Sequence, residues 1–149
     1  MNLKLIGKTA LVTGSTAGIG LAIAESLVAE GANVVLNGRT RERVEAAVIT
    51  VKAGFPDIRI TGVVADLSTP EGAAKVLDGI SDVDILVNNM GIFEPKPFEQ
   101  IPDEDWLRLF EANVMSGVRL SRFCASRDIL PRRSEAESFW NSFSHGLQP

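Results

Sequence analysis

Residues 13–20 read Thr-Gly-Ser-Thr-Ala-Gly-Ile-Gly, and this stretch decides the fold. The apolar run at 9–13 stops at Gly14, as a buried parallel strand does. The apolar spacing that follows predicts a helix from Gly18 to Glu30, which Gly31 is placed to end. The residues that carry this spacing are Ile19, Ala22, Ile23 and Leu27. A strand, a glycine-rich turn and a helix are therefore expected in direct succession.

The same alternation continues along the chain. The expected elements are strands at 33–37, 58–65 and 83–88 and helices at 40–53, at 70–80 and from 103 onward. Thr40 and Thr69 stand where N-cap residues are preferred, and Pro70 occupies a first helical position. Four alternations of strand and helix predict right-handed crossovers and an α/β fold, a parallel sheet with helices on both faces.

Composition excludes several classes of function. The net charge of −4 argues against a nucleic-acid groove and against an anionic membrane surface as partner. No apolar run is long enough to span a bilayer, and the N-terminal residues lack a secretory apolar core. One cysteine, Cys124, and one histidine, His145, are too few for a disulfide or a zinc cluster, so no metal is expected. The expectation is a soluble cytoplasmic protein.

The glycine-rich turn has the chemistry of a phosphate site. A helix N-terminus presents unpaired N–H groups and partial positive charge, which suit a pyrophosphate. Glycines allow the backbone to turn tightly and to approach a phosphate without a Cβ clash. The spacing here is Gly-x-x-x-Gly-x-Gly rather than Gly-x-Gly-x-x-Gly. Its place between a strand and a helix favours a nucleotide turn over a turn used only for packing.

Four motifs in order resemble those of the short-chain dehydrogenases/reductases. Residues 13–20 match the signature Thr-Gly-x-x-x-Gly-Ile-Gly, and Asp66-Leu67 match the aspartate and apolar residue after the third strand. Residues 88–91 read Asn-Asn-Met-Gly where the family has Asn-Asn-Ala-Gly, and Asn113 matches the asparagine of the family's fifth helix. The resemblance covers residues 3 to about 123. It implies a Rossmann-like doubly wound parallel sheet of strand order 3-2-1-4, followed by that long helix.

The resemblance also implies a dinucleotide site. Six residues would surround the pyrophosphate: Gly14, Ser15, Thr16, Gly18, Ile19 and Gly20. Asp66 would accept a hydrogen bond from the adenine amino group, and Leu67 would pack against the ring. Asn89, Met90 and Gly91 would line the adenosine ribose. Asn88 is interpreted as structural, tying the fourth strand to its neighbour.

The end of the second strand favours NADP over NAD. An NAD site places an acidic side chain there to bind the ribose 2′-hydroxyl, but residues 36–40 contain no carboxylate. Arg39 instead offers a charge-assisted fork that suits a 2′-phosphate. Arg41 and Arg43 are expected on a solvated helix face. NAD remains the less favoured alternative.

Catalytic residues are largely missing from this resemblance. The family is implied to reduce carbonyls with a tyrosine, a lysine four residues on, a serine at a strand end and the helical asparagine. The chain contains no tyrosine and no lysine after Lys96, and no later serine ends a strand, so Asn113 is the only match. His145 is interpreted as a solvated tail residue. Hydride transfer by this chain is therefore doubtful.

The family pattern ends at about residue 123. No valine follows Val118, and serines become frequent after residue 120. We therefore expect an incomplete dinucleotide-binding domain over 1–123 and an unrelated tail over 124–149. The tail carries one apolar helical stripe, which comprises Ala136, Phe139, Trp140, Phe143 and Leu147. A loss of pattern within one helix indicates a reading-frame shift, hence a truncated and catalytically incompetent oxidoreductase.

Two other hypotheses stay open. In the first, the chain is a non-catalytic nucleotide-binding or interaction module whose tail helix caps the sheet. In the second, it is an active oxidoreductase that uses unfamiliar acids. In each case the fourth strand is expected at an exposed edge, which favours self-association without the complete family oligomer.

Overall fold

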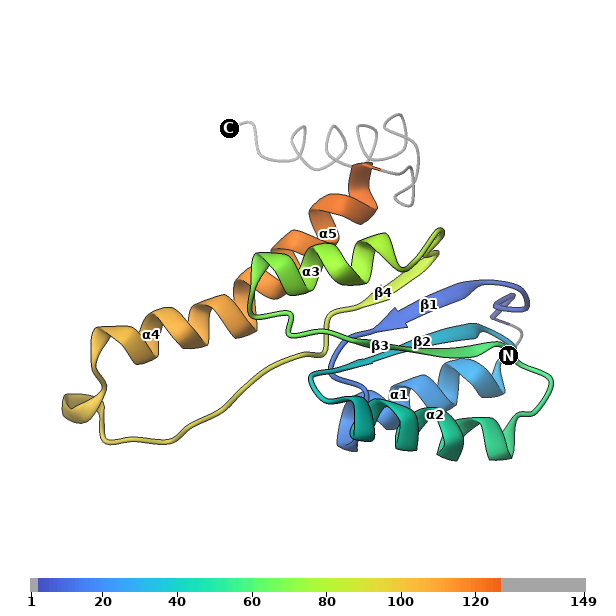
Figure 1. Cartoon of the computed structure of the whole chain (residues 1–149), viewed down its shortest axis with the longest axis horizontal. Coiled ribbons are helices and arrows are strands. Elements are labelled where there is room, and N and C mark those ends of the chain that lie inside the picture. Colours follow the sequence, from blue (N-terminus) through green and yellow to red (C-terminus); the bar gives the residue numbers. More distant parts are fainter. Residues whose placement is uncertain (1–2, 127–149) are drawn as a thin grey trace, which may run out of the picture.

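The computed structural model describes residues 3–126, in which strands and helices alternate as expected (Figure 1). The elements are β1 (Thr9–Val12), α1 (Gly18–Ala29), β2 (Asn33–Gly38), α2 (Arg41–Gly54), β3 (Ile60–Val64), α3 (Pro70–Asp78), β4 (Ile85–Val87), the 3₁₀ turn η1 (Phe98–Gln100), α4 (Asp103–Phe110), the π turn η2 (Glu111–Met115) and α5 (Ser116–Ser126). The predicted tail stripe lies outside the described residues.

The four strands form one parallel sheet of order β3-β2-β1-β4, which confirms the predicted topology. Leu11 at the centre of β1 pairs in register with Val35 of β2 and Leu86 of β4. In Figure 1, α1 and α2 cover one face of the sheet, and α3 and α5 cover the other. Each face therefore buries its own apolar cluster, one around Leu36 and one around Leu11.

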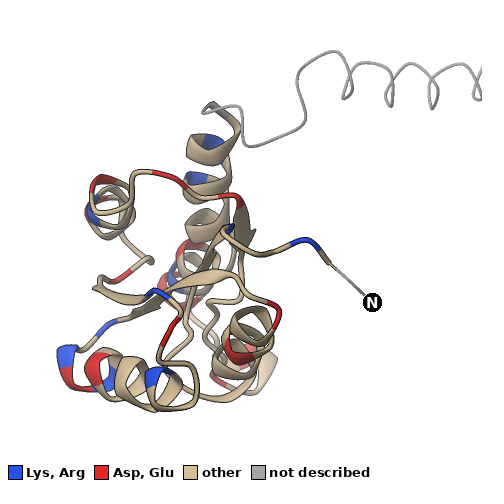
Figure 2. Cartoon of the chain, turned by 90° about the vertical axis from the view of Figure 1, so that its right-hand side faces the viewer, with Lys and Arg blue, Asp and Glu red and all other residues tan. Residues whose placement is uncertain are grey.

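Charged side chains stay off the sheet. None of the four strands contains Lys, Arg, Asp or Glu. Figure 2 shows these residues on helices and connecting segments instead. Strands that are covered on both faces read as continuous apolar runs because neither face meets water.

The helix predicted from the apolar spacing after Gly18 is confirmed as α1, but its most deeply buried residues are not the ones that carry that spacing. The residues that it buries are Gly20, Ala24 and Val28, whereas Ile19 is 77% exposed. Ala22 is also exposed, and Ile23 and Leu27 are only partly buried. The residues buried on α1 thus form a stripe at positions 20, 24 and 28, one helical turn apart.

The two predicted threonine caps differ. The Thr69 hydroxyl accepts a hydrogen bond from Gly72 N at 3.0 Å, which confirms it as the cap of α3. Thr40 occupies the N-cap position of α2, but its side chain makes no cap hydrogen bond. The Thr40 hydroxyl therefore does not accept a hydrogen bond from the first amide groups of α2.

The start of β4 is held to the start of β1 through Asp84. Its carboxylate accepts hydrogen bonds from Lys8 Nζ and from Thr9 N, each at 2.8 Å. The Lys8 bond, and after it the Thr9 bond, lower the pKa of the Asp84 carboxyl below its ordinary value. At the opposite end, β4 leads into an extended segment that runs to α4.

The long helix from Asp103 is interrupted at its middle. The π turn η2 joins α4 to α5, and Asn113 lies within this turn. Figure 1 shows α4 reaching away from the sheet beside the segment that follows β4. An ion-pair cluster holds that segment to the helix, with Glu94 and Lys96 on one side and Asp105 and Arg108 on the other. Within residues 3–126, no helix has both the length and the apolar character needed to cross a bilayer.

Candidate functional site

The glycine-rich turn between β1 and α1 has two residues that require glycine. Gly14 and Gly18 have φ angles of +60° and +59°, where side chains carry steric strain. A Cβ atom on Gly14 would lie 3.1 Å from Met90 Cα, whereas one on Gly18 would meet nothing within 4 Å. The turn is thus tightly packed at Gly14 and open at Gly18.

Thr13 connects this turn to the residues after β4. Its hydroxyl accepts hydrogen bonds from Asn89 N at 2.9 Å and from Met90 N at 2.8 Å. The same hydroxyl donates to the Val87 carbonyl at 3.2 Å. One buried side chain therefore fixes the path of the Asn-Asn-Met-Gly segment relative to β1.

Asn89 makes the reciprocal contacts. Its side-chain amide donates to the carbonyl oxygens of Thr13 at 2.9 Å and Gly14 at 3.2 Å. A Cβ on Gly20 would collide with this amide and lie 2.6 Å from the Gly14 oxygen. The first turn of α1, the glycine turn and Asn89 consequently pack as one unit.

Sequence reasoning missed the part that Asn37 plays. Its carboxamide oxygen accepts from Gly14 N at 3.3 Å, and its nitrogen donates to the carbonyls of Val63 at 3.2 Å and Ala65 at 3.3 Å. The side chain is 2% exposed, so it joins the turn, β2 and β3 from inside the fold. A polar residue that ends an otherwise apolar run was the available signal.

Ser15 is engaged in the same way. Its hydroxyl donates to the Val12 carbonyl at 2.7 Å and accepts from Asn37 N at 3.0 Å. Its own amide donates to the Asn37 carbonyl at 2.9 Å. These groups are satisfied within the protein, so Ser15 shapes the turn and offers no free side-chain group to a ligand.

A cleft of about 680 Å³ opens at the carboxyl ends of the strands, beside the turn. Seven of the predicted cofactor-binding residues line it: Gly14, Thr16, Arg39, Leu67, Asn89, Met90 and Gly91. The other five are not among its lining residues, namely Ser15, Gly18, Ile19, Gly20 and Asp66. The lining residues that the sequence did not predict are Asn37, Gly38, Thr40, Glu42, Arg43, Ala65 and Ile92.

The cleft has a cationic end. Arg39 and Arg43 line it, and neither makes a hydrogen bond or ion pair to any other residue of the described range 3–126. Arg43 is exposed, as its expected place on a solvated face implies, but that face borders the cleft. Among the described residues that line the cleft, Glu42 contributes the only carboxylate.

Asp66 and Leu67 follow β3 at this edge. The Leu67 side chain is buried and lines the cleft. One oxygen of Asp66 accepts from Ser68 N at 3.0 Å and from the Ser68 hydroxyl at 2.7 Å. The carboxylate thus closes a tight turn at the start of α3.

The two remaining motif asparagines, Asn113 and Asn88, each connect the segment after β4 to the long helix. Asn113 accepts from Ile92 N at 2.7 Å and donates to the Ile92 carbonyl at 3.0 Å, so it anchors the segment after Gly91 to the π turn. Asn88 was expected to tie β4 to a neighbouring strand. Its amide instead donates to the Ser121 hydroxyl on α5 at 3.0 Å.

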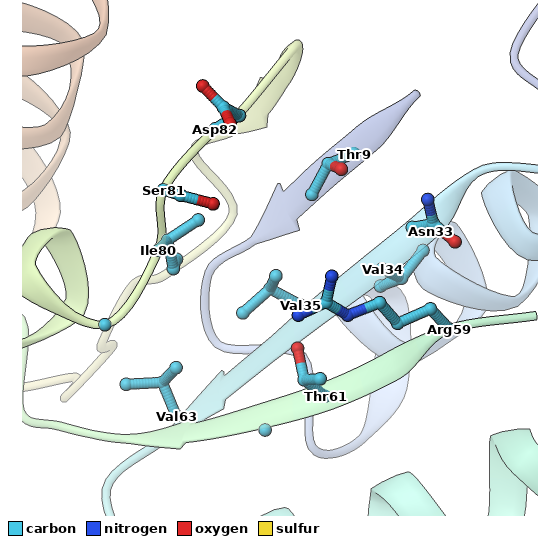
Figure 3. A pocket seen from close by; sticks show the side chains of 12 residues that line it. Thr9, Asn33, Val34, Val35, Arg59, Thr61, Val63, Ile80, Ser81 and Asp82 are labelled. Carbon is cyan, nitrogen blue, oxygen red and sulfur yellow. The ribbon is translucent and has the colours of Figure 1, made fainter. Parts of the chain in front are cut away.

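A second depression, of about 260 Å³, lies at the opposite end of the sheet (Figure 3). It is lined by the amino ends of three strands, including Thr9 and Asn33, and by residues after α3. In Figure 3 the Arg59 side chain extends across the floor near Val35. None of the predicted site residues lines this depression, so the cleft beside the glycine turn is the candidate site.

The cleft fits a dinucleotide phosphate. Gly14 and Thr16 of the turn line it, and two residues after Thr16, outside the lining, Gly18 begins a 12-residue helix that has no side-chain cap. Arg39 adds a guanidinium without a partner among residues 3–126. Amide groups at a helix start and a guanidinium are donors that bind phosphate oxygens.

Comparisons with known proteins agree with this geometry. The sequence profile of the short chain dehydrogenase family matches residues 8–134. The uncharacterized oxidoreductase YvaG of Bacillus subtilis (strain 168) is 52% identical over 122 residues, which are 82% of this chain and 46% of that protein. The chain thus spans about half the length of the curated relatives it matches.

Solved structures match over the same part. The L-sorbose reductase of Gluconobacter frateurii, in complex with NADPH and L-sorbose, has a TM-score of 0.78 and 40% identity, covering 82% of this chain and 48% of that one. A blue fluorescent protein from a metagenomic library, in complex with NADPH, has a TM-score of 0.75 and 30% identity, covering 85% of this chain and 52% of that one. The two share the fold described above.

Proposed function

The chain belongs to the short-chain dehydrogenase family, and from this premise we propose that it binds NADP(H) in the cleft beside the glycine turn. One observation carries the proposal. The cleft joins the turn of Gly14 and Thr16 to Arg39, a guanidinium without a partner among residues 3–126. Family relatives with solved structures hold NADPH, which supports the choice of ligand.

Each predicted residue has a part in this proposal. Backbone amide groups of the glycine turn and of the start of α1 would hold the pyrophosphate. The residues concerned are Gly14, Thr16, Gly18, Ile19 and Gly20, and Ser15 would shape the backbone of the turn. Leu67 would pack on the adenine and Asp66 would accept from its amino group. Asn89, Met90 and Gly91 would lie along the ribose. Arg39 would pair with the 2′-phosphate, which disfavours NAD.

The nicotinamide of a bound cofactor supplies hydride chemistry. The side chains that a carbonyl reductase needs beside it are a separate requirement, because a proton must reach the oxygen as the carbon is reduced. No tyrosine occurs in the 149 residues, and both polar groups of the Asn113 side chain are used by Ile92. We therefore infer that this chain binds the dinucleotide without reducing a carbonyl, and we assign it no substrate.

Three further parts of the proposal concern the whole chain. We propose residues 1–123 as the dinucleotide-binding unit, with 124–149 outside it. Exposed apolar side chains on the long helix favour self-association. We propose a cytoplasmic location, which the presence of a single cysteine in the sequence supports.

A titration of the purified chain with NADPH tests the proposal. We expect saturable binding, followed by the fluorescence of the reduced nicotinamide, and no NADPH oxidation when carbonyl compounds are added. Gly14→Asp should weaken binding at least about tenfold, because it puts a carboxylate and a strained φ into the turn. Gly54→Asp is the matched control, since a Cβ there meets nothing within 4 Å and φ is not positive.

Circular dichroism establishes that each variant is folded. If Gly14→Asp does not fold, Arg39→Ala replaces it, because Arg39 is exposed and its loss should weaken NADPH binding without disturbing the core. Folded wild-type chain that shows no saturable binding would refute the cofactor proposal. Carbonyl-dependent NADPH oxidation above that of the Gly14→Asp variant would refute the inference that the chain is non-catalytic.

A further inference from the structure

The three arginines around the start of α2 have different surroundings. Arg39 and Arg43 line the cleft beside the glycine turn. Arg41 lies between them in sequence but lines a groove on another side of α2, with Val48 and Gly62. Arg41 and Arg43 are two residues apart on α2, about half a helical turn, so their side chains leave opposite sides of the helix.

Their electrostatic partners differ as well. Arg41 forms an i,i+4 ion pair with Glu45 at 3.4 Å, which partly satisfies its charge. Neither Arg39 nor Arg43 has an ion pair or hydrogen bond to another residue within 3–126. The cleft lining therefore contains two guanidinium groups and one carboxylate, that of Glu42, so this end carries net positive charge.

The cleft lining has two guanidinium groups, although one guanidinium is enough for a bidentate hydrogen bond to a phosphate. A phosphate monoester carries close to two negative charges at neutral pH and has three acceptor oxygens, enough for two guanidinium groups. A ribose hydroxyl carries no charge and gives a second guanidinium nothing to pair with. Two cations at one end of the cleft are therefore matched to a phosphate and not to a hydroxyl.

We infer that Arg43 is a second determinant of specificity for the 2′-phosphate, shared with Arg39, whereas Arg41 contributes nothing to it. The inference rests on the proposed binding of NADP(H). It assigns a ligand to a residue that sequence reasoning left on a solvated face. Glu42, in the same lining, opposes the phosphate and limits the affinity that the two arginines provide.

Parallel titrations of the full chain with NADP⁺, NAD⁺, 2′,5′-ADP and 5′-ADP test this role. We expect Arg43→Ala to weaken NADP⁺ and 2′,5′-ADP about tenfold, the loss typical of one charge-assisted contact at a wet site, and to leave NAD⁺ and 5′-ADP unchanged. Arg43→Lys should retain part of the preference. Arg41→Ala, the matched control, should leave all four affinities unchanged, and Glu42→Gln should tighten the two 2′-phosphate ligands.

The outcomes separate this inference from the proposal beneath it. Wild-type chain that binds none of the four ligands would refute both. Wild-type chain that prefers NADP⁺ while Arg43→Ala keeps the wild-type ratio of NADP⁺ to NAD⁺ affinity would refute only the inference. An equal loss for NADP⁺ and NAD⁺ in Arg43→Ala would also refute it, because that result indicates a structural role for the side chain.

Discussion

At the scale of single residues, Thr13 shows how one hydroxyl sets the shape of the candidate site. Three backbone groups meet it where β4 ends, two amides that donate to it and one carbonyl that accepts from it. The side chain is 1% exposed, so water cannot replace these bonds. The position of Asn89 and Met90 in the cleft wall depends on this hydroxyl.

Replacing Thr13 tests that dependence. Thr13→Val keeps the shape but removes the acceptor of Met90 N and leaves Asn89 N with only the Val87 carbonyl, so we expect the free energy of unfolding to fall by about 2 kcal/mol. Thr13→Ser keeps the hydroxyl and should lose less than about 1 kcal/mol. Urea titration followed by circular dichroism measures both. Equal losses for the two variants would show that the hydroxyl bonds carry no net stability.

The residue scale is also where sequence reasoning was least reliable. It identified the glycines of the turn because Gly14 and Gly18 adopt positive φ, a requirement that leaves a trace in the residue type. It predicted α1 from the spacing of its larger apolar residues, whereas the residues buried most deeply include the small Gly20 and Ala24, which hydrophobic spacing does not mark. The parts of Asn37 and Arg43 depend on what lies opposite them in space, which one sequence does not contain.

At the scale of elements, the packing of α3 against the loop after β3 depends on Gly72. A Cβ there would overlap the carbonyl oxygen of Asp66 and lie 2.5 Å from its carbon. Both are backbone atoms, which cannot rotate away. The loop that carries Asp66 and Leu67 therefore sits directly on the first turn of α3.

Two glycine substitutions in this helix should differ sharply. We expect Gly72→Ala to lower the free energy of unfolding by about 3 kcal/mol, because the loop or the helix must move. Gly79→Ala, at the other end of α3, adds a Cβ at an ordinary 3.4 Å from the Lys75 oxygen and should change stability by less than about 0.5 kcal/mol. Thermal unfolding of both proteins decides the matter, and similar melting temperatures would contradict the packing described.

The junction of β1 and β4 should respond to pH. Because Lys8 and Thr9 lower the pKa of Asp84 in the folded protein, its contribution to stability is present above its unfolded pKa of about 3.9 and is lost as pH falls through the folded value. Unfolding free energy measured from pH 7 to pH 2 should thus fall more steeply below about pH 4 in wild type than in Asp84→Asn. Asp82→Asn serves as the control, since that carboxylate has no bonded partner within 3–126. Its stability should follow the wild-type pH curve. If it follows the Asp84→Asn curve instead, the assignment of the pH dependence to Asp84 is contradicted.

At the scale of the whole molecule, the described fold ends in an exposed apolar surface. Trp106, Phe110 and Val114 recur every four residues along α4 and η2 and are 50%, 51% and 43% exposed. β4 also stands at the edge of the described sheet. Contiguous apolar surface and an open strand edge both favour association between chains.

Phe110→Glu should reduce that association. We expect sedimentation velocity to show a larger monomer fraction than in wild type at equal concentration, because a carboxylate cannot be buried unpaired in an apolar interface. Ile49→Glu is the control, since Ile49 is 69% exposed on α2, far along the chain from this surface. An equal effect of both variants would mean that added charge alone, rather than the long helix, governs assembly.

The order of the sheet was the most predictable property of the molecule. Alternating strands and helices leave few topologies once crossovers are right-handed, and the motifs then select the order 3-2-1-4. The extent of each element was less predictable. Residues 58–65 and 83–88 were expected as strands, whereas β3 spans Ile60–Val64 and β4 only Ile85–Val87, because pairing depends on neighbours that the local sequence does not show.

The buried Asn37 makes the cleft conditional on the rest of the fold. Its hydrogen bonds reach residues 23, 26 and 28 positions away, so the turn is held only when β1, β2 and β3 have already paired. A ligand of this cleft then binds the native ensemble and not the unfolded chain. By mass action it stabilises the whole domain by about 2.7 kcal/mol at a hundred times its dissociation constant. Ligand concentration thereby controls the fraction of the chain that is folded, independent of any reaction that the cofactor undergoes.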